Sequence, residues 1–130
     1  MGAEHPYRTA CRDIVGLAAS GVLLGDASVE LVQEFVHVRT HRLGDRRESA
    51  EAGREIGTLC RLHPLEPEDL RLGLELFEES TRLELRDALH AATALNRGIG
   101  LIVSTDRAFD VVAGLERVDP LSAVDRLTEP

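Results

Sequence analysis

The chain has 130 residues, of which 43% are hydrophobic and 29% are charged, a balance typical of one globular domain and not of disorder. No apolar run approaches the roughly 18 residues of a membrane span, and the first residues lack the pattern of a secretory signal. We therefore expect a single domain over residues 1–130, a cytoplasmic location, and Cys11 and Cys60 as reduced, buried thiols.

The charge balance excludes one class of function. Fifteen basic residues, all of them Arg, stand against 23 acidic ones, which gives a formal net charge of −8. A protein that holds nucleic acid by bulk charge is expected to be basic. Any contact with nucleic acid must therefore be local, through a basic patch or through metal ions that neutralise carboxylates.

Helical patterns alternate with short apolar runs, which indicates an α/β fold with a parallel sheet. Helices are predicted over residues 5–19, 28–39 (or from 26), 46–62, 67–79, 83–97 and 106–113. Strands are predicted over residues 21–25, 63–65, 101–103 and 115–118. The tail over about residues 122–130 is expected to be frayed.

Turn and cap residues set these boundaries. Asp26 or Ser28 is a suitable N-cap for the second helix, and Asp45 with Glu48 has the spacing of a capping box. Pro67 suits the first turn of the helix that follows it.

Glu34 lies at the margin between the apolar and polar faces of its helix when the sequence is placed on a wheel of about 100° per residue. On its own, that position is typical of a surface Glu. A metal ligand is the other interpretation.

Asp87 lies in the segment LRDALHAATAL, one turn before Ala91 and two before Ala94. Small side chains on that face would let another backbone come close and leave the carboxylate half-buried. An acid early in a helix is also favoured by the helix dipole, so both readings stay open.

Asp106 follows the apolar run 101–103 and precedes a predicted helix. Open α/β sheets place their ligands at the carboxyl ends of strands, so this is a candidate ligand position. An N-cap role, with Ser104 or Thr105 helping, is the alternative. Asp110, one turn on, is either a fourth ligand or a surface residue.

Carboxylates that converge at one end of a sheet repel one another and need a cation. Oxygen ligands select a hard ion such as Mg²⁺ or Mn²⁺, which also binds phosphate oxygens. The chemistry that fits such a site is metal-assisted hydrolysis of a phosphodiester bond.

At these residues the sequence resembles the PIN-domain ribonucleases, in particular the VapC toxins of bacterial toxin–antitoxin pairs. The matching segments are SVELVQEFVHV, LRDALHAATAL and LIVSTDRAF, and their order and spacing match over about residues 4–121. The resemblance implies a three-layer α/β/α domain with a central parallel sheet. It implies that Glu34, Asp87 and Asp106 bind metal and that Ser104 supports the site.

The same resemblance implies an activity and partners. It points to a Mg²⁺-dependent endoribonuclease acting on structured RNA, a cognate antitoxin that blocks the site, and a homodimer. The family's first strand, which ends in a metal-binding Asp, has no counterpart here, and neither Asp13 nor Asp26 replaces it. We therefore expect the natural protein to carry roughly a dozen more residues before Met1.

Two further groups of side chains bear on function. His37 and His41 have the spacing of a helical zinc pair, but the helix is expected to end between them and no third ligand is evident, so no zinc site is expected. A group of Arg residues follows the Glu34 helix and either grips RNA phosphates or forms a solvated loop; its members are Arg39, Arg42, Arg46 and Arg47.

The sequence thus favours a metal-dependent endoribonuclease that is the toxin of a type II toxin–antitoxin pair. The rival interpretation is a catalytically impaired PIN-like module that binds an antitoxin or RNA without cleavage. A generic small hydrolase is a distant third, because no nucleophile is evident.

Overall fold

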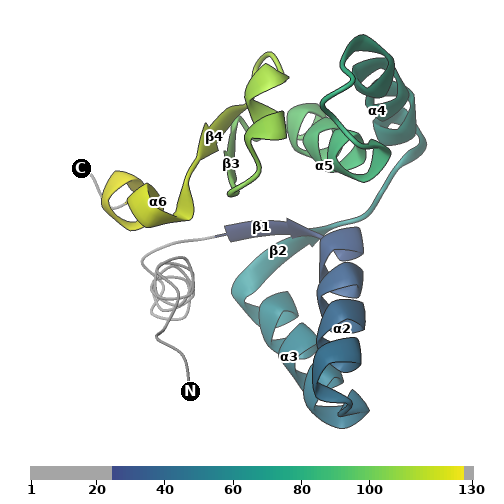
Figure 1. Cartoon of the computed structure of the whole chain (residues 1–130), viewed down its shortest axis with the longest axis vertical. Coiled ribbons are helices and arrows are strands. Elements are labelled where there is room, and N and C mark those ends of the chain that lie inside the picture. The colour runs from purple at the N-terminus through teal and green to yellow at the C-terminus, as the bar shows by residue number, and fades with distance from the viewer. Residues whose placement is uncertain (1–24, 128–130) are drawn as a thin grey trace. The chain divides into compact units, whose positions relative to one another are not determined.

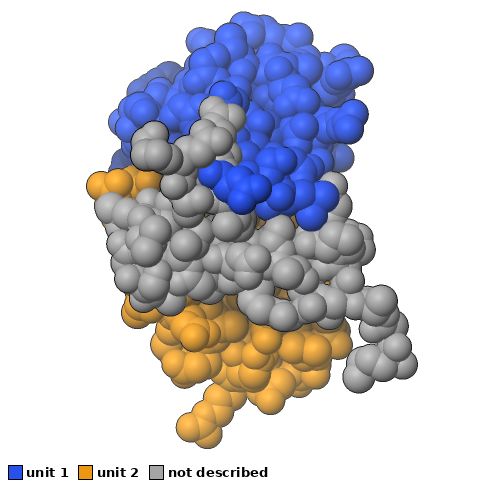
Figure 2. Space-filling view, turned by 90° about the vertical axis from the view of Figure 1, so that its left-hand side faces the viewer, with its two compact units in different colours: residues 1–23, 66–130 blue, residues 24–65 orange. Residues whose placement is uncertain are grey.

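A computed structural model of the protein describes residues 25–127. The chain divides into two compact units, which Figure 2 colours separately and which are described here one at a time. One unit spans residues 24–65, and the other contains residues 1–23 and 66–130. The helix predicted over residues 5–19 and most of the strand predicted over 21–25 lie outside the described residues.

The unit of residues 24–65 is a pair of parallel strands joined by two helices (Figure 1). In chain order its elements are β1 (Gly25–Ser28), α2 (Val29–Leu43), α3 (Arg46–Leu59) and β2 (Cys60–His63). Gly25 lies opposite Cys60 and Ser28 opposite His63 in a parallel register. Parallel strands need a long crossover connection, and here α2 and α3 supply it.

Strand β1 continues further than the sequence predicts, so Asp26 lies within the strand and not at a helix cap. Ser28 takes the cap position, and its side chain accepts a hydrogen bond of 2.9 Å from the Leu31 N–H. Of the two N-cap candidates, Ser28 is therefore confirmed.

Helix α2 runs to Leu43, so the expected end near residue 39, between His37 and His41, is wrong. The helix ends at Gly44, which adopts a φ of 70° and donates its N–H to the Thr40 carbonyl at 2.8 Å. Glycine takes this left-handed conformation without the steric cost of a side chain, which explains why the helix ends here and not earlier.

Helix α3 begins as predicted but ends earlier. The Asp45 carboxylate accepts the Glu48 N–H at 3.0 Å, whereas the Glu48 carboxylate accepts from Arg39 Nε at 2.9 Å instead of closing the capping box. The helix ends at Leu59 and not at residue 62, because the next four residues pair with β1 as strand β2. Strand β2 therefore begins three residues before the strand predicted over 63–65 and overlaps it only at His63.

The second unit is described over residues 66–127. Its elements are α4 (Pro67–Glu79), α5 (Leu85–Asn96), β3 (Leu101–Val103), the 3₁₀ helix η1 (Arg107–Val111), β4 (Glu116–Val118) and α6 (Pro120–Leu127). Strands β3 and β4 are parallel, with Leu101 opposite Glu116. The bounds of α4 and β3 match the sequence prediction, and the helix predicted over 106–113 is the shorter η1.

The prediction that the chain is frayed from residue 122 is wrong up to Leu127, because α6 continues to that residue. Pro120 begins the helix, where its missing N–H is not needed. Ala123 is fully buried, which anchors the helix.

The core of the second unit joins α5 to η1 and the segment after it. It is a cluster of Leu83, Ala88, Ala91, Phe109, Val112 and Leu115. In strand β3, Leu101 and Ile102 are half-buried and Val103 is exposed. The expected mixed α/β class with parallel strands is confirmed, and no helix within residues 25–127 is long and apolar enough to cross a membrane.

Candidate metal centre

Asp106 lies three residues after the end of β3 and caps η1. Its Oδ1 accepts the Ala108 N–H at 2.9 Å, and its own N–H donates to Ser104 Oγ at 3.0 Å. The side chain is exposed. The predicted cap role is therefore confirmed, and the Ser104 hydroxyl holds the loop that presents this carboxylate.

Asp87 lies in the first turn of α5 and is half-buried. Burial raises the pKa of its carboxyl, and the nearby negative charge of Asp106 raises it further, whereas His90 and Arg86 lower it. Both effects disfavour the ionised carboxylate, which is the environment that a bound cation relieves.

Core packing brings these two acids together. Asp87 immediately precedes Ala88, which is fully buried, and Asp106 lies three residues before Phe109, which belongs to the same core cluster. Ala88 and Phe109 belong to the same cluster, and the charge of Asp106 raises the pKa of Asp87, so the two carboxylates lie within electrostatic range of each other. The pairing of Asp87 with Asp106 therefore follows from the fold of a single unit.

Glu34 lies in the middle of α2, in the unit of residues 24–65, and is half-buried. The structure thus brings Asp87 and Asp106 together within one unit and leaves Glu34 in the other. Within residues 25–127, no group of three or more His, Cys, Asp or Glu side chains is already arranged to hold a metal ion.

Asp110 is engaged in an ion pair. Arg117 Nε donates to its Oδ1 at 2.8 Å, and Arg117 Nη1 also donates to the Ser104 carbonyl at 3.0 Å. Arg117 thereby links η1 to the loop that carries Asp106, which gives Asp110 a role in positioning that loop.

Comparison with known families matches residues 3–115 to the PIN domain, a region that includes Glu34, Asp87 and Asp106. The chain belongs to the PIN-domain family. The match extends across both compact units, so the unit of residues 24–65 is part of the PIN domain and not a separate module.

Curated PIN-domain relatives agree with this assignment. The chain is 40% identical to ribonuclease VapC7 of Mycobacterium tuberculosis over 124 residues, which cover 94% of this chain and 85% of that protein. It is 28% identical to ribonuclease VapC13 of M. tuberculosis and to VapC ribonuclease Mb1869c of Mycobacterium bovis, over 91% of this chain and 90% of each relative. No solved structure gives a significant match.

A buried network that sequence reasoning missed fixes α5 in this PIN domain. Asp69 is fully buried at the start of α4, and its Oδ1 accepts from Asn96 Nδ2 at 2.8 Å and from Arg97 Nη1 at 2.9 Å. Its Oδ2 accepts the Glu66 N–H at 2.8 Å. The one sequence signal is an acid three residues after Glu66 with Pro67 between them, which is the spacing of a capping box.

A second missed contact lies on the strands of the other unit. His63 Nε2 and Asp26 Oδ1 are 2.7 Å apart, and Arg61 Nε lies 3.2 Å from the same oxygen. Cys60 is a free, half-buried thiol, and its pKa is raised by burial and then by the charge of Asp26. These contacts tie β1 to β2, and only the strand register, which the sequence does not display, places them together.

The Arg residues proposed to contact RNA differ in their surroundings. Arg39 is held by the Glu48 carboxylate, and its guanidinium lies 5.8 Å from the centre of the Phe35 ring. Arg42 and Arg46 are exposed. Arg39 therefore has a structural role in joining α2 to α3. The three exposed members of the group, Arg42, Arg46 and Arg47, are better placed for a ligand.

Proposed function

We propose that this PIN-domain protein is a divalent-metal-dependent endoribonuclease and the toxin of a type II toxin–antitoxin pair. The observation that supports the proposal is that Asp87 and Asp106 adjoin residues of one core cluster and interact electrostatically. Its similarity to proteins named as VapC ribonucleases supports the choice of RNA as substrate.

The side chains present fit a hard divalent ion. Asp87 and Asp106 offer carboxylate oxygens only, the donors that Mg²⁺ and Mn²⁺ prefer, and their mutual repulsion is relieved by a cation. Glu34 is proposed as the third acid of the same centre. When bound, such an ion supplies an activated water and stabilises the oxygen that leaves phosphorus.

The chain's own residues then have separable roles. Asp106 is oriented by the Ser104 hydroxyl and by its cap bond to Ala108, so its carboxylate is presented in one direction. Asp87 is held by a helix whose far end is fixed by Asp69. Preorganised ligands of this kind hold the reacting phosphate without rearrangement during the reaction.

The test is cleavage of labelled tRNA and of a labelled RNA stem–loop by the purified chain, with Mg²⁺ and with EDTA. We expect cleavage that EDTA stops, and a loss of more than about 100-fold in Asp106→Asn and in Asp87→Asn. Asn is as good an N-cap as Asp, so Asp106→Asn keeps the fold. Glu75→Gln, which removes an exposed acid of α4, is the matched control and should change the rate less than about 3-fold.

Cleavage that persists in EDTA would contradict the proposal. If the folded chain cuts neither RNA, the non-catalytic binding module becomes the preferred function.

An antitoxin and a second copy of the chain are the proposed protein partners. Co-expression with the protein encoded beside it should give a complex that no longer cleaves RNA. The mass of the isolated chain in solution should be that of a dimer; a monomeric mass would remove the homodimer from the proposal.

A further inference from the structure

The α2–α3 hairpin carries a concentration of positive charge in an otherwise acidic protein. Residues 36–47 contain four Arg and two His side chains but only one acid, Asp45, whereas the whole chain has a net charge of −8. The Asp45 carboxylate is also engaged, because it accepts the Glu48 N–H as the cap of α3. The Arg39 guanidinium is paired with Glu48, so Arg42, Arg46 and Arg47 supply the positive charge that makes this segment locally basic.

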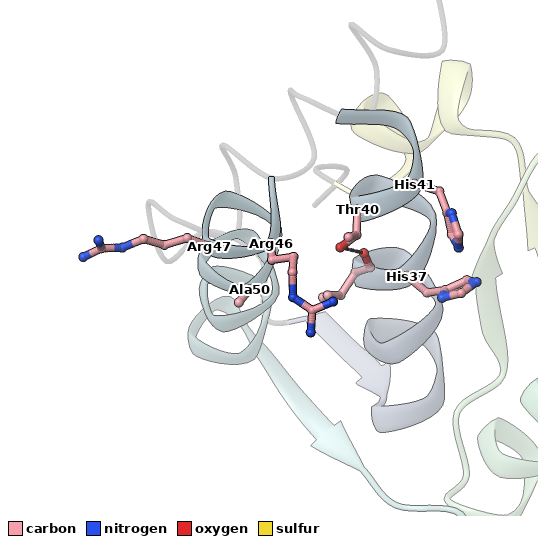
Figure 3. A pocket seen from close by; sticks show the side chains of 7 residues that line it. His37, Thr40, His41, Arg46, Arg47 and Ala50 are labelled. Carbon is pink, nitrogen blue, oxygen red and sulfur yellow. Dashed lines mark hydrogen bonds between the residues drawn. The ribbon is translucent and has the colours of Figure 1, made fainter. Parts of the chain in front are cut away.

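A hollow of about 660 Å³ lies in this segment. Its lining residues are Val36, His37, Thr40 and His41 from α2 and Arg46, Arg47 and Ala50 from α3. Figure 3 shows the two imidazoles projecting from the side of α2 that faces away from α3, while Arg46 lies between the two helices and Arg47 extends outward from α3. We call His37, His41, Arg46 and Arg47 the His–Arg patch.

The two imidazoles act as a pair because α2 does not end between them. Their ring centroids are 4.5 Å apart, in an edge-to-face arrangement. Both side chains are exposed. An imidazole has an N–H donor whether it is neutral or protonated, so the pair can donate to phosphate oxygens in either state.

The patch is continuous with Glu34. His37 follows Glu34 by three residues and His41 follows it by seven, which places all three within about 60° of the helix circumference. The two rings therefore lie about 4.5 and 10.5 Å along the helix axis from the proposed metal-binding acid. A phosphodiester chain with one phosphate near Glu34 would run on along this face of α2.

We propose that the His–Arg patch is a phosphate-binding subsite for RNA, in which His37 and His41 contact the backbone beside the scissile phosphate. The inference rests on the proposed function for the substrate class, and it assigns these side chains to binding and not to metal coordination. Positive charge explains how a protein of net charge −8 holds an anionic substrate, since phosphate contacts supply most of the sequence-independent affinity for nucleic acid.

Binding of a fluorescein-labelled RNA stem–loop, measured by anisotropy in EDTA, tests the patch without cleavage. We expect the double variant His37→Gln/His41→Gln to bind about 10-fold more weakly than the native chain. Arg46→Gln/Arg47→Gln should weaken binding similarly and reduce the dependence of log affinity on log salt by about 1 to 2. His37→Arg/His41→Arg should restore the affinity, because Arg also donates to phosphate.

Two controls separate binding from folding. His63→Gln removes an imidazole of the same unit that is engaged with Asp26, and Arg54→Gln removes an exposed charge of α3; both should bind the RNA within about 2-fold of the native chain. Thermal denaturation of each variant shows whether it is folded.

The outcomes also separate this inference from the proposed function. Weaker binding by the His variant, in a chain that never cleaves RNA, would support the patch and overturn the endonuclease. Unchanged RNA binding by the folded His and Arg variants, in a chain that does cleave, would overturn the patch alone. The His and Arg variants could instead lose binding to a polyglutamate peptide that the native chain binds, while their RNA binding is unchanged. That result would also overturn the patch as an RNA subsite and would assign the surface to an acidic protein partner.

Discussion

Asp87 is half-buried beside a second carboxylate, and this raises its pKa. When folding raises the pKa of an acid, its ionised form is less favourable in the folded chain than in the unfolded chain. The negative charge of Asp87 therefore destabilises the metal-free protein at neutral pH. In a metal-binding site a bound cation offsets this destabilisation, whereas an acid with a purely structural role has no such compensation.

We therefore expect Asp87→Asn to raise the thermal midpoint of the metal-free protein, measured in EDTA at pH 7, while RNA cleavage is lost. The neutral amide keeps the shape of the side chain and removes the repulsion from Asp106. Glu75→Gln should leave the midpoint unchanged. A midpoint for Asp87→Asn below that of the native chain would mean that the carboxylate stabilises the fold.

Asp69 shows the opposite behaviour. Burial raises the pKa of its carboxyl, but the bonds from Arg97, Asn96 and the Glu66 N–H outweigh burial, so the pKa lies below its usual value of 3.8. The ionised form is therefore stabilised in the folded state. That stability is present above pH 3.8 and is lost as the pH falls through the lower pKa of the folded protein.

Asp69→Asn should lower the free energy of unfolding at pH 7 by about 2–3 kcal/mol, because it leaves the Arg97 guanidinium without its buried partner. The difference between the variant and the native chain should shrink below pH 3.8. Urea denaturation at several pH values measures both effects, with Glu68→Gln, an exposed neighbour, as the control. A pH-independent difference would show that the charge of Asp69 is not the cause.

Helices α2 and α3 pack closely at one glycine. A Cβ added at Gly53 would lie 2.6 Å from Val36 Cγ2, and Val is restricted in its rotamers, so the contact is not easily relieved. Gly57, one turn later on α3, has only ordinary contact for such a Cβ, at 3.5 Å from Leu62 Cδ1.

These two glycines make a matched pair of substitutions in one helix. Gly53→Ala should destabilise the protein by about 1–2 kcal/mol through overpacking, whereas Gly57→Ala should stabilise it by about 0.5–1 kcal/mol through helix propensity. The free energy of unfolding in urea distinguishes them. Equal effects of the two substitutions would contradict the close packing of α2 on α3.

Elements defined by local signals were predictable from the sequence. Pro67 fixes the start of α4, and the apolar run of β3 is short and uninterrupted. The boundary between α3 and β2 was not predictable, because residues 60–62 continue a helical pattern and become a strand only by pairing with β1. Helix α6 was not predicted at all, for a similar reason, since the burial of Ala123 is a tertiary effect.

In the candidate site, too, features with a local sequence signal were predictable and features that depend on tertiary packing were not. Asp106 was recognisable because a strand and a cap motif adjoin it in sequence, and Asp87 because small residues mark its helix face. Its proximity to Asp106 depends on Ala88 and Phe109 sharing one core, which no local pattern displays. The network around Asp69 was missed because its partners lie 27 and 28 residues away.

At the scale of the whole molecule, acidic and basic groups are unevenly distributed. The α2–α3 hairpin is basic between residues 36 and 47, whereas Asp87 and Asp106 supply negative charge in the other unit. The proposed phosphate-binding surface and two of the proposed cation ligands, Asp87 and Asp106, thus belong to different units of one PIN domain. This arrangement reconciles a net charge of −8 with an RNA substrate.

The central proposal is that Glu34, Asp87 and Asp106 are ligands of a divalent cation. Its most direct test is calorimetric titration of the metal-free chain with Mn²⁺. We expect the native chain and Glu75→Gln to bind equally, and Glu34→Gln and Asp106→Asn each to bind at least about 10-fold more weakly. Equal Mn²⁺ affinity in the native chain and in folded Asp106→Asn, or no binding by the folded native chain, would contradict the account.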